Sequence, residues 1–297
     1  MSTFKKVLVA VDLDERSANY VLESAKQLLP DVALTVIHVL ERSHFYNMGD
    51  ASFSIVDDIH VRIVAEVKTY LEKLCRAHGV GEHILLEGHP ATLIQQHAEE
   101  HDFDLIVLGT HGRHGIKRLL GSTANAVLHG TQSNVLAIRV PSADVTVPPA
   151  HIKYRRVLAA IDLSDESSQV LDVAQHLGDK EHAQINVVHV IKPFHHAYAG
   201  INPATLSDVG LRFEQEADQQ ARAELRTIAL SRGFAEDAMQ VRHGSPNLEI
   251  HDAVEELRSD LLVIGTHGKK GVQLLLGSVA NSVIHGITCD VLAVRIR

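Results

Sequence analysis

The chain has 297 residues, about twice the size of a compact domain, so two domains of roughly 150 residues are expected. A hydrophobic fraction of 45% and a charged fraction of 22% are typical of globular proteins and exclude an extensively disordered chain. The formal net charge of −9 argues against DNA or RNA as the main partner, because binding to a phosphate backbone needs clustered Lys and Arg.

The first apolar run, residues 7–11, is shorter than the core of a secretory signal, and no run approaches the ~20 apolar residues of a membrane span. Cys75 and Cys289 form neither a disulfide framework nor a CxxC site. The 21 histidines are scattered and show no metal-ligand spacing. We therefore expect a cytoplasmic protein with no membrane partner and no intrinsic metal.

Strands and helices are expected to alternate along the first half of the chain. The apolar run at 7–13 predicts a buried strand, and Asp14 or Ser17 can cap a following helix that Pro30 stops. The later elements are a strand at 34–39, a helix with Ile63, Val64, Val67, Leu71, Leu74 and Cys75 on one face and Gly79 at its end, a strand at 83–88, a helix at 91–99, a strand at 104–109, a helix at 122–129 and a strand at 134–140. This alternation predicts an α/β domain with a five-stranded parallel sheet and helices on both faces.

The second half of the chain repeats the first. Residues 105–140 align without a gap on residues 261–296, and 20 of the 36 positions are identical. The amino ends match as well, 5–17 with 155–167 and 36–40 with 187–191. Such a repeat predicts two copies of one domain.

The segment between the copies has no helical or strand period. Residues 141–154 contain three prolines and are typical of a linker. We predict a first domain at 1–141, a linker at 142–153 and a second domain at 154–297.

A glycine-rich loop follows the fourth strand of each copy. Its glycines let the backbone approach a ligand, and a serine at a helix start can cap the helix beside free amides. The loops comprise Gly109, His111, Gly112, Gly121 and Ser122 in the first copy, and Gly265, His267, Gly268, Gly277 and Ser278 in the second. With Asp12 and Asp162 at the ends of the first strands, this arrangement predicts a phosphate-binding crevice at the carboxyl ends of strands one and four.

A second interpretation of these residues stays open. The glycines and aspartates also suit tight turns and helix caps with no ligand. The chain contains no GxxxxGK[ST] loop, no GxGxxG after its first strand and no GxSxG, so efficient hydrolysis of nucleoside triphosphates is not indicated.

The sequence resembles the universal stress proteins of the tandem type. The resemblance covers essentially the whole chain and rests on VDL at 11–13, IDL at 161–163, the two GTHG loops, and GSTANAVLHG with its partner GSVANSVIHG. It implies flavodoxin-like domains of the adenine nucleotide alpha hydrolase-like type, ATP binding as in some members, and association through the last strand.

The resemblance also implies roles for individual residues. Asp12 and Asp162 would contact adenine, and Val39 and Val190 would line its pocket. Ribose and phosphates would be held by Gly109, His111, Gly112, Gly121 and Ser122, and by Gly265, His267, Gly268, Gly277 and Ser278. His38 and His189, in the second strands, are instead expected to be packed core residues.

The spacing of the loop departs from the family pattern. ATP-binding members have nine residues between the second and third glycines, whereas both copies here have eight, 113–120 and 269–276. A shorter loop can favour AMP over ATP, and Mg would accompany ATP. The ligand is therefore predicted to be ATP or AMP.

Three functions follow, of which the first is preferred. It is a binding switch operated by an adenine nucleotide. The second is an interaction or chaperone-like stress protein without nucleotide, and the third is a weak ATPase or self-phosphorylating protein using Ser122 or Ser278. The last strands, 134–140 and 290–296, are expected to pair the two domains as a pseudo-dimer, and the whole chain is expected to form a homodimer.

Overall fold

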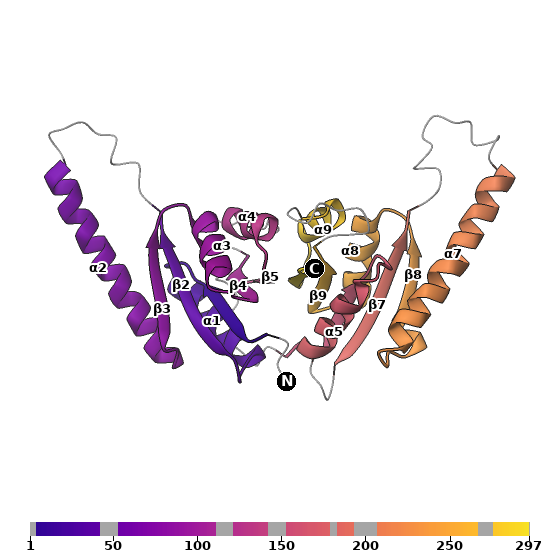
Figure 1. Ribbon diagram of the computed structural model, residues 1–297, viewed down its shortest axis with the longest axis horizontal. Helices are drawn as coiled ribbons and strands as arrows, with labels where there is room; N and C mark the ends of the chain where they lie inside the picture. Colours follow the sequence, from indigo (N-terminus) through magenta and orange to yellow (C-terminus); the bar gives the residue numbers. More distant parts are fainter. Residues whose placement is uncertain are drawn as a thin grey trace. The chain divides into compact units, whose positions relative to one another are not determined.

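A computed structural model describes residues 4–41, 53–110, 121–141, 153–178, 183–192, 207–266 and 276–296. The chain divides into two compact units, Met1–Ile152 (unit 1) and Lys153–Arg297 (unit 2), whose elements are labelled in Figure 1. The predicted linker lies outside the described residues except for Lys153.

Unit 1 is a doubly wound α/β domain. Its elements are β1 (Lys6–Ala10), α1 (Glu15–Leu28), β2 (Ala33–Leu40), α2 (Phe53–His78), β3 (Glu82–Glu87), α3 (Pro90–Glu100), β4 (Leu105–Gly109), α4 (Ser122–Gly130) and β5 (Asn134–Ile138). The strands are parallel in the order β3-β2-β1-β4-β5. Helices α1 and α2 pack together on the sheet, as do α3 and α4, so both faces are covered.

Unit 2 repeats this architecture. Its elements are β6 (Arg156–Ala160), α5 (Ser167–Leu177), β7 (Gln184–Ile191), α7 (Ser207–Leu230), a 3₁₀ turn η4 (Glu236–Ala238), β8 (Met239–His243), α8 (Pro246–Glu256), β9 (Leu261–Gly265), α9 (Ser278–Ile284) and β10 (Asp290–Val294). The strand order within the unit is β8-β7-β6-β9-β10, again parallel. The predicted fold class is confirmed.

The central strands form the core of each unit. Val7, Leu8 and Val9 of β1 and the aligned Val157, Leu158 and Ala159 of β6 are all inaccessible to solvent. Side chains on both faces of these strands are buried because helices cover both faces, which explains the continuous apolar runs in the sequence.

The topology brings the ends of distant segments together. After β3 the chain returns past β1 and adds β4 on its other side, with Ala10 paired to Leu108. The winding reverses between β1 and β4, and between β6 and β9 in unit 2. A crevice at the carboxyl ends of these neighbouring strands is the usual ligand position in such sheets.

Local signals account for several helix ends. Asp14 is the N-cap of α1 and accepts a hydrogen bond from the Ser17 backbone N–H at 2.8 Å. Helix α2 ends before Gly79, whose φ of +64° favours glycine. Asp14 is therefore the cap and Gly79 the stop, as predicted.

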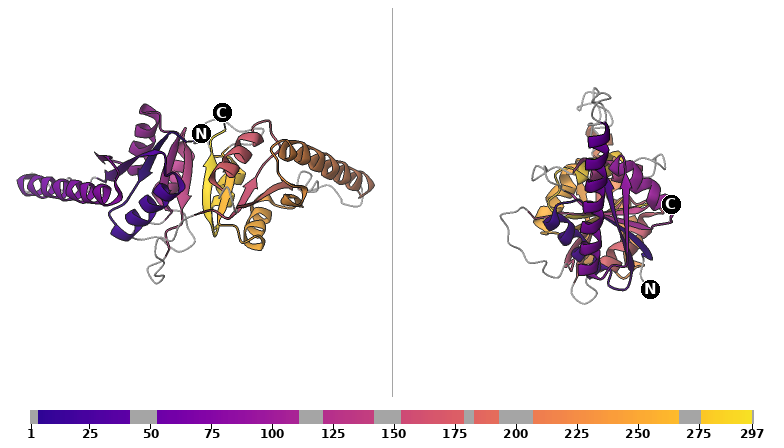
Figure 2. Two further views of the ribbon diagram at one scale, coloured as in Figure 1. Left: turned by 90° about the horizontal axis from the view of Figure 1, so that it is seen from below. Right: turned by 90° about the vertical axis from the view of Figure 1, so that its left-hand side faces the viewer.

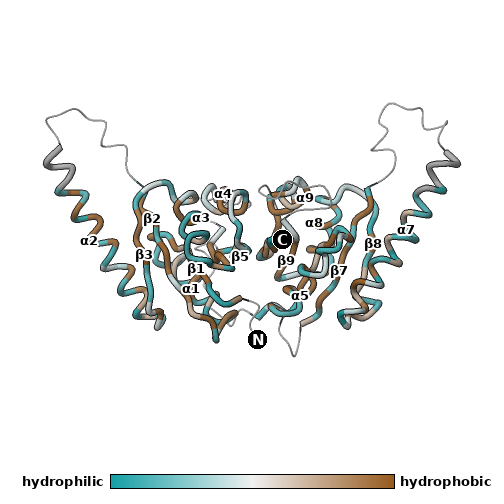
Figure 3. The backbone as a smooth tube through the Cα atoms, in the orientation of Figure 1, coloured by the Kyte–Doolittle hydropathy of each residue, from teal (hydrophilic) through white to brown (hydrophobic). Residues whose placement is uncertain are grey.

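The apolar face predicted for α2 is correct only in part. Val67 and Leu71 are buried, but Ile63 is 42% exposed. The reason is the length of α2, which begins at Phe53 and projects past the sheet of unit 1, as Figure 2 shows. Figure 3 shows hydrophobic and hydrophilic stretches alternating along the helix. Within the described residues, no helix is long and apolar enough to cross a membrane.

Candidate ligand-binding site

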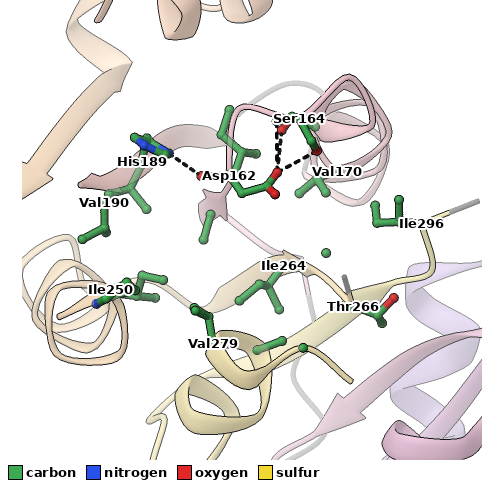
Figure 4. Close-up of a pocket in the computed structure, with 18 of the residues that line it drawn as sticks. Asp162, Ser164, Val170, His189, Val190, Ile250, Ile264, Thr266, Val279 and Ile296 are labelled. Carbon is green, nitrogen blue, oxygen red and sulfur yellow. Dashed lines mark hydrogen bonds between the residues drawn. The ribbon is translucent and has the colours of Figure 1, made fainter. Parts of the chain in front are cut away.

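A cavity of about 600 Å³ opens in unit 2 at the carboxyl ends of β6, β7 and β9. Its volume is typical of small-molecule sites. Figure 4 shows its apolar walls, to which Val170, Val190, Ile250, Ile264, Val279 and Ile296 contribute. Its polar side chains are Asp162, Ser164, Ser167, His189, Lys192, Thr266 and Ser278. The cavity lies where the sequence predicted a crevice.

Asp162 is held in a fixed orientation at the edge of this cavity. Its Oδ1 accepts hydrogen bonds from the Ser164 backbone N–H at 3.1 Å and from the hydroxyls of Ser164 at 2.7 Å and Ser167 at 3.2 Å. Leu163, between them, is buried and has a φ of +58°, a conformation that non-glycine residues rarely adopt. The turn therefore orders the carboxylate next to the apolar wall, as Figure 4 shows.

Asp12 has the same place in unit 1 but different neighbours. Its Oδ1 accepts a hydrogen bond from the Asp14 backbone N–H at 3.2 Å. Burial raises the pKa of Asp12, and the Asp14 carboxylate raises it further, while hydrogen bonds from Asp14 and Ser17 act in the opposite direction. Both aspartates thus order the turn after their strand, as the ligand-free interpretation allows, and Asp162 also lines a cavity.

The acidic residues around Asp12 also affect Tyr70 of α2. Burial raises its pKa to about 12, with further contributions from Glu15, Asp12 and Asp14. Among the described residues, its buried hydroxyl has no hydrogen-bond partner. No sequence signal identified Tyr70, because its position depends on how α2 packs beside α1.

A backbone hydrogen bond joins the described ends of each glycine-rich loop. Gly121 donates its N–H to the Thr110 carbonyl at 2.6 Å, and Gly277 donates to Thr266 at the same distance. Each contact joins the end of a strand to the start of a helix. His111, Gly112, His267 and Gly268 lie outside the described residues, so their predicted roles stay predictions.

The predicted serine cap is wrong in detail. Gly121 and Gly277 are the N-caps of α4 and α9, and neither helix has a side-chain capping bond. Ser122 and Ser278 are the first helical residues, so the capping positions fall one residue earlier, on the glycines that bond to the strand ends. The first amides of α4 consequently carry no capping oxygen, a feature that suits an anion.

Two histidines support the strand ends. His38 Nδ1 lies 2.8 Å from the Val11 carbonyl and His189 Nδ1 lies 2.9 Å from the Ile161 carbonyl. Burial lowers the pKa of His38, so its neutral form, with Nδ1 donating, is favoured. His38 is buried, as predicted for a core residue, whereas His189 is only half-buried, because it lines the cavity.

The remaining predicted residues that the structure describes lie at or near the carboxyl ends of the strands. Val39 is buried at the end of β2, and Val190 lines the cavity. Gly265 also lines it, at the end of β9. At Gly109 a Cβ would lie 3.2 Å from Val21 and Val140, which makes glycine the best fit. Within the described ranges, no group of three His, Cys, Asp or Glu side chains could hold a metal.

Ser164, Ser167 and Lys192 were not predicted as site residues. Ser17 and Ser167 align at the offset of Asp12 and Asp162, five residues after each aspartate, so their repetition was a usable signal. Lys192 follows β7 directly and had no such signal, since the residue aligned with it is Glu41.

Comparison with known proteins identifies the family. Residues 3–139 and 153–295 each match the model of the Universal stress protein family. Universal stress protein A homolog 1 of Coxiella burnetii is 36% identical over 144 residues, covering 48% of this chain and 98% of the relative. Universal stress protein E homolog of Haemophilus influenzae is 23% identical over 312 residues, covering 98% of this chain and 97% of the relative.

A solved structure shares the fold along nearly the whole chain. The crystal structure of a universal stress protein from Archaeoglobus fulgidus has a TM-score of 0.62 and 22% sequence identity, and 98% of each chain is covered. The two family matches together account for almost every residue of the sequence. The chain therefore belongs to the universal stress protein family and carries two of its domains in tandem.

Proposed function

We propose that this protein binds an adenine nucleotide at the carboxyl ends of the first and fourth strands of its domains. The observation that carries the proposal is the cavity of unit 2, where apolar walls meet one oriented carboxylate, Asp162. Apolar walls suit a flat aromatic base, and a fixed carboxylate suits an amino or hydroxyl group. Gly265 and Gly277 line the same cavity, where backbone without side chains can approach phosphates.

The proposed action is that of a binding switch. A nucleotide that contacts both Asp162 after β6 and the start of α9 would stabilise one arrangement of these segments. Differential affinity for two conformations then couples occupancy to the partners of the protein. The proposal includes ATP or AMP as ligand, Mg with ATP, a cytoplasmic location, a homodimer, and pairing of the two domains through their last strands.

The test is to identify what the purified protein carries. Freshly purified protein is denatured, and released small molecules are identified by chromatography and mass spectrometry. The proposal expects an adenine nucleotide that is lost in the double variant Asp12→Ala, Asp162→Ala and retained in the matched variant Asp31→Ala, Asp172→Ala, whose carboxylates lie on exposed surface. Protein that carries no nucleotide and binds none added at millimolar concentration would favour the interaction-protein function instead.

A further inference from the structure

The two crevices differ in charge at structurally equivalent positions. Gly88 donates its N–H to the Leu40 carbonyl and Gly244 donates to the Ile191 carbonyl, each at 3.0 Å, which fixes the equivalence of the second strands. The residue that follows is Glu41 in unit 1 and Lys192 in unit 2. Both side chains are exposed, and Lys192 lines the cavity.

A second difference lies beside the equivalent aspartates Asp12 and Asp162. Ser164 lines the cavity of unit 2 and donates two hydrogen bonds to Asp162, whereas unit 1 has Asp14 at this position. Asp14 adds a carboxylate close enough to Asp12 to disfavour ionisation of its side chain. One neutral hydrogen-bond donor in unit 2 is thus replaced by a negative charge in unit 1.

These substitutions change the net charge of the crevice. In unit 2 the charged lining residues are Asp162 and Lys192, which cancel. The aligned residues in unit 1 are Asp12, Asp14 and Glu41, which are all acidic. Unit 1 is therefore more negative by three charges at these positions.

Sequence differences in the glycine-rich loops, whose residues 111–120 and 267–275 lie outside the described ranges, reduce this contrast without removing it. The loop of unit 1 has three basic residues within 111–120, and the loop of unit 2 has two within 267–275, so a difference of two charges remains. Arg16 of unit 1 aligns with Glu166 of unit 2, but Glu166 is not among the residues that line the cavity. The difference between Arg16 and Glu166 therefore does not enter the charge of the unit 2 cavity.

We propose that the two crevices select ligands by phosphate charge, so that unit 2 binds ATP and unit 1 prefers the same base with fewer phosphates. This inference rests on the proposed function and adds that the two domains prefer nucleotides with different numbers of phosphates. Without a divalent cation, the repulsion expected in unit 1 corresponds to a weakening of ATP binding by about tenfold or more relative to unit 2. Adenosine, which is uncharged, is expected to bind the two units with similar affinity.

Calorimetric titration of the full chain with ATP, AMP and adenosine, in a buffer of low ionic strength without Mg, tests this inference. Wild-type protein is expected to show one tight and one weak ATP site. Lys192→Glu should weaken the tight site by about tenfold, and Glu41→Lys should tighten the weak site by a similar factor. Neither substitution should alter adenosine binding.

Two control variants make the same charge changes at positions outside the crevices. Lys153→Glu precedes β6 and Glu72→Lys lies near the C-terminal end of α2, both exposed and away from the carboxyl ends of the strands. They should leave the ATP sites unchanged. Two ATP sites of equal affinity, or crevice variants that behave like their controls, would overturn the inference while leaving nucleotide binding intact. Absence of binding for all three ligands would instead overturn the proposed function and the inference with it.

Discussion

Gly121 donates its backbone N–H to the carbonyl oxygen of Thr110 at 2.6 Å, so the end of β4 and the start of α4 are in direct contact. A Cβ atom at position 121 would lie 2.9 Å from the same oxygen, a separation that Cβ atoms essentially never show. The φ of Gly121 is −59°, which any residue can adopt. Glycine is therefore required here by the close approach of two backbone segments rather than by an unusual backbone conformation.

Gly121→Ala is expected to separate these segments and to destabilise unit 1 by about 2 kcal/mol. Thermal unfolding of the full chain measures the loss, and nucleotide titration measures the expected weakening of a site in unit 1. Gly81→Ala is the control, because no atom lies within 4 Å of a Cβ at that position. If the two variants unfold at the same temperature, the contact does not constrain the loop.

Tyr70→Phe is expected to stabilise the protein. The substitution removes a buried hydroxyl for which the described residues offer no hydrogen-bond partner, with a gain of about 1 kcal/mol in the free energy of unfolding. Tyr154→Phe is the matched control with the opposite sign, since the Tyr154 hydroxyl donates to Asp290 at 2.8 Å. Denaturant unfolding compares the two. A loss of stability in Tyr70→Phe would show that the hydroxyl has a partner in solution.

Asp12→Asn is expected to raise the melting temperature at neutral pH while weakening ligand binding. Burial raises the pKa of Asp12, so the folded state binds its proton more tightly than the unfolded state. Its stabilising contribution is present at low pH and is lost as pH rises through the raised pKa. Removing the charge should raise Tm by about 2 °C at pH 7 and by less at pH 3. Asp31→Asn, at an exposed position, should change neither value.

The His97 and His101 rings stack with centroids 4.1 Å apart at the end of α3, close to Lys6 and Phe103. Burial lowers the pKa of His97, and His101 and Lys6 lower it further, while Glu100 raises it. A lowered pKa means that this contribution to stability is present above the unfolded value, near 6.5, and is lost as pH falls through the folded value.

His97→Gln should therefore reduce the loss of stability as pH falls below about 6.5. Unfolding midpoints measured across this range test the expectation. If His97→Gln loses stability at low pH as steeply as the wild type, the lowered pKa of His97 does not contribute to the pH dependence.

Several elements were predictable because local signals determine them. Asp14 caps α1 and Gly79 ends α2 through interactions within a few residues, and the buried strands are continuous apolar runs. The repeat extended each prediction to the second unit. Ile63 was placed wrongly because helical periodicity identifies an apolar face but not how far the sheet beneath it extends.

The predictable parts of the site lie at the strand ends and at the start of the helix after the glycine-rich loop. Asp162 and Gly265 could be placed at the carboxyl edge from the strand pattern alone. The bonds from Ser164 and Ser167 to Asp162 depend on the turn around Leu163, and the effect of Asp12 on the pKa of Tyr70 depends on helix packing. The turn is local, but spacing alone does not determine its backbone conformation, and the packing of α2 beside α1 is tertiary.

The most direct test of nucleotide binding is calorimetric titration of ATP and AMP into the full chain, beside the variant Asp162→Ala. Asp162 lines the cavity and is positioned by three hydrogen bonds, so its removal should weaken the site in unit 2 by at least about tenfold without unfolding the protein. Saturable heat in the wild type that is reduced in the variant is the predicted result. Wild-type protein that gives no heat with either nucleotide, or a variant that binds as tightly as the wild type, would contradict the account.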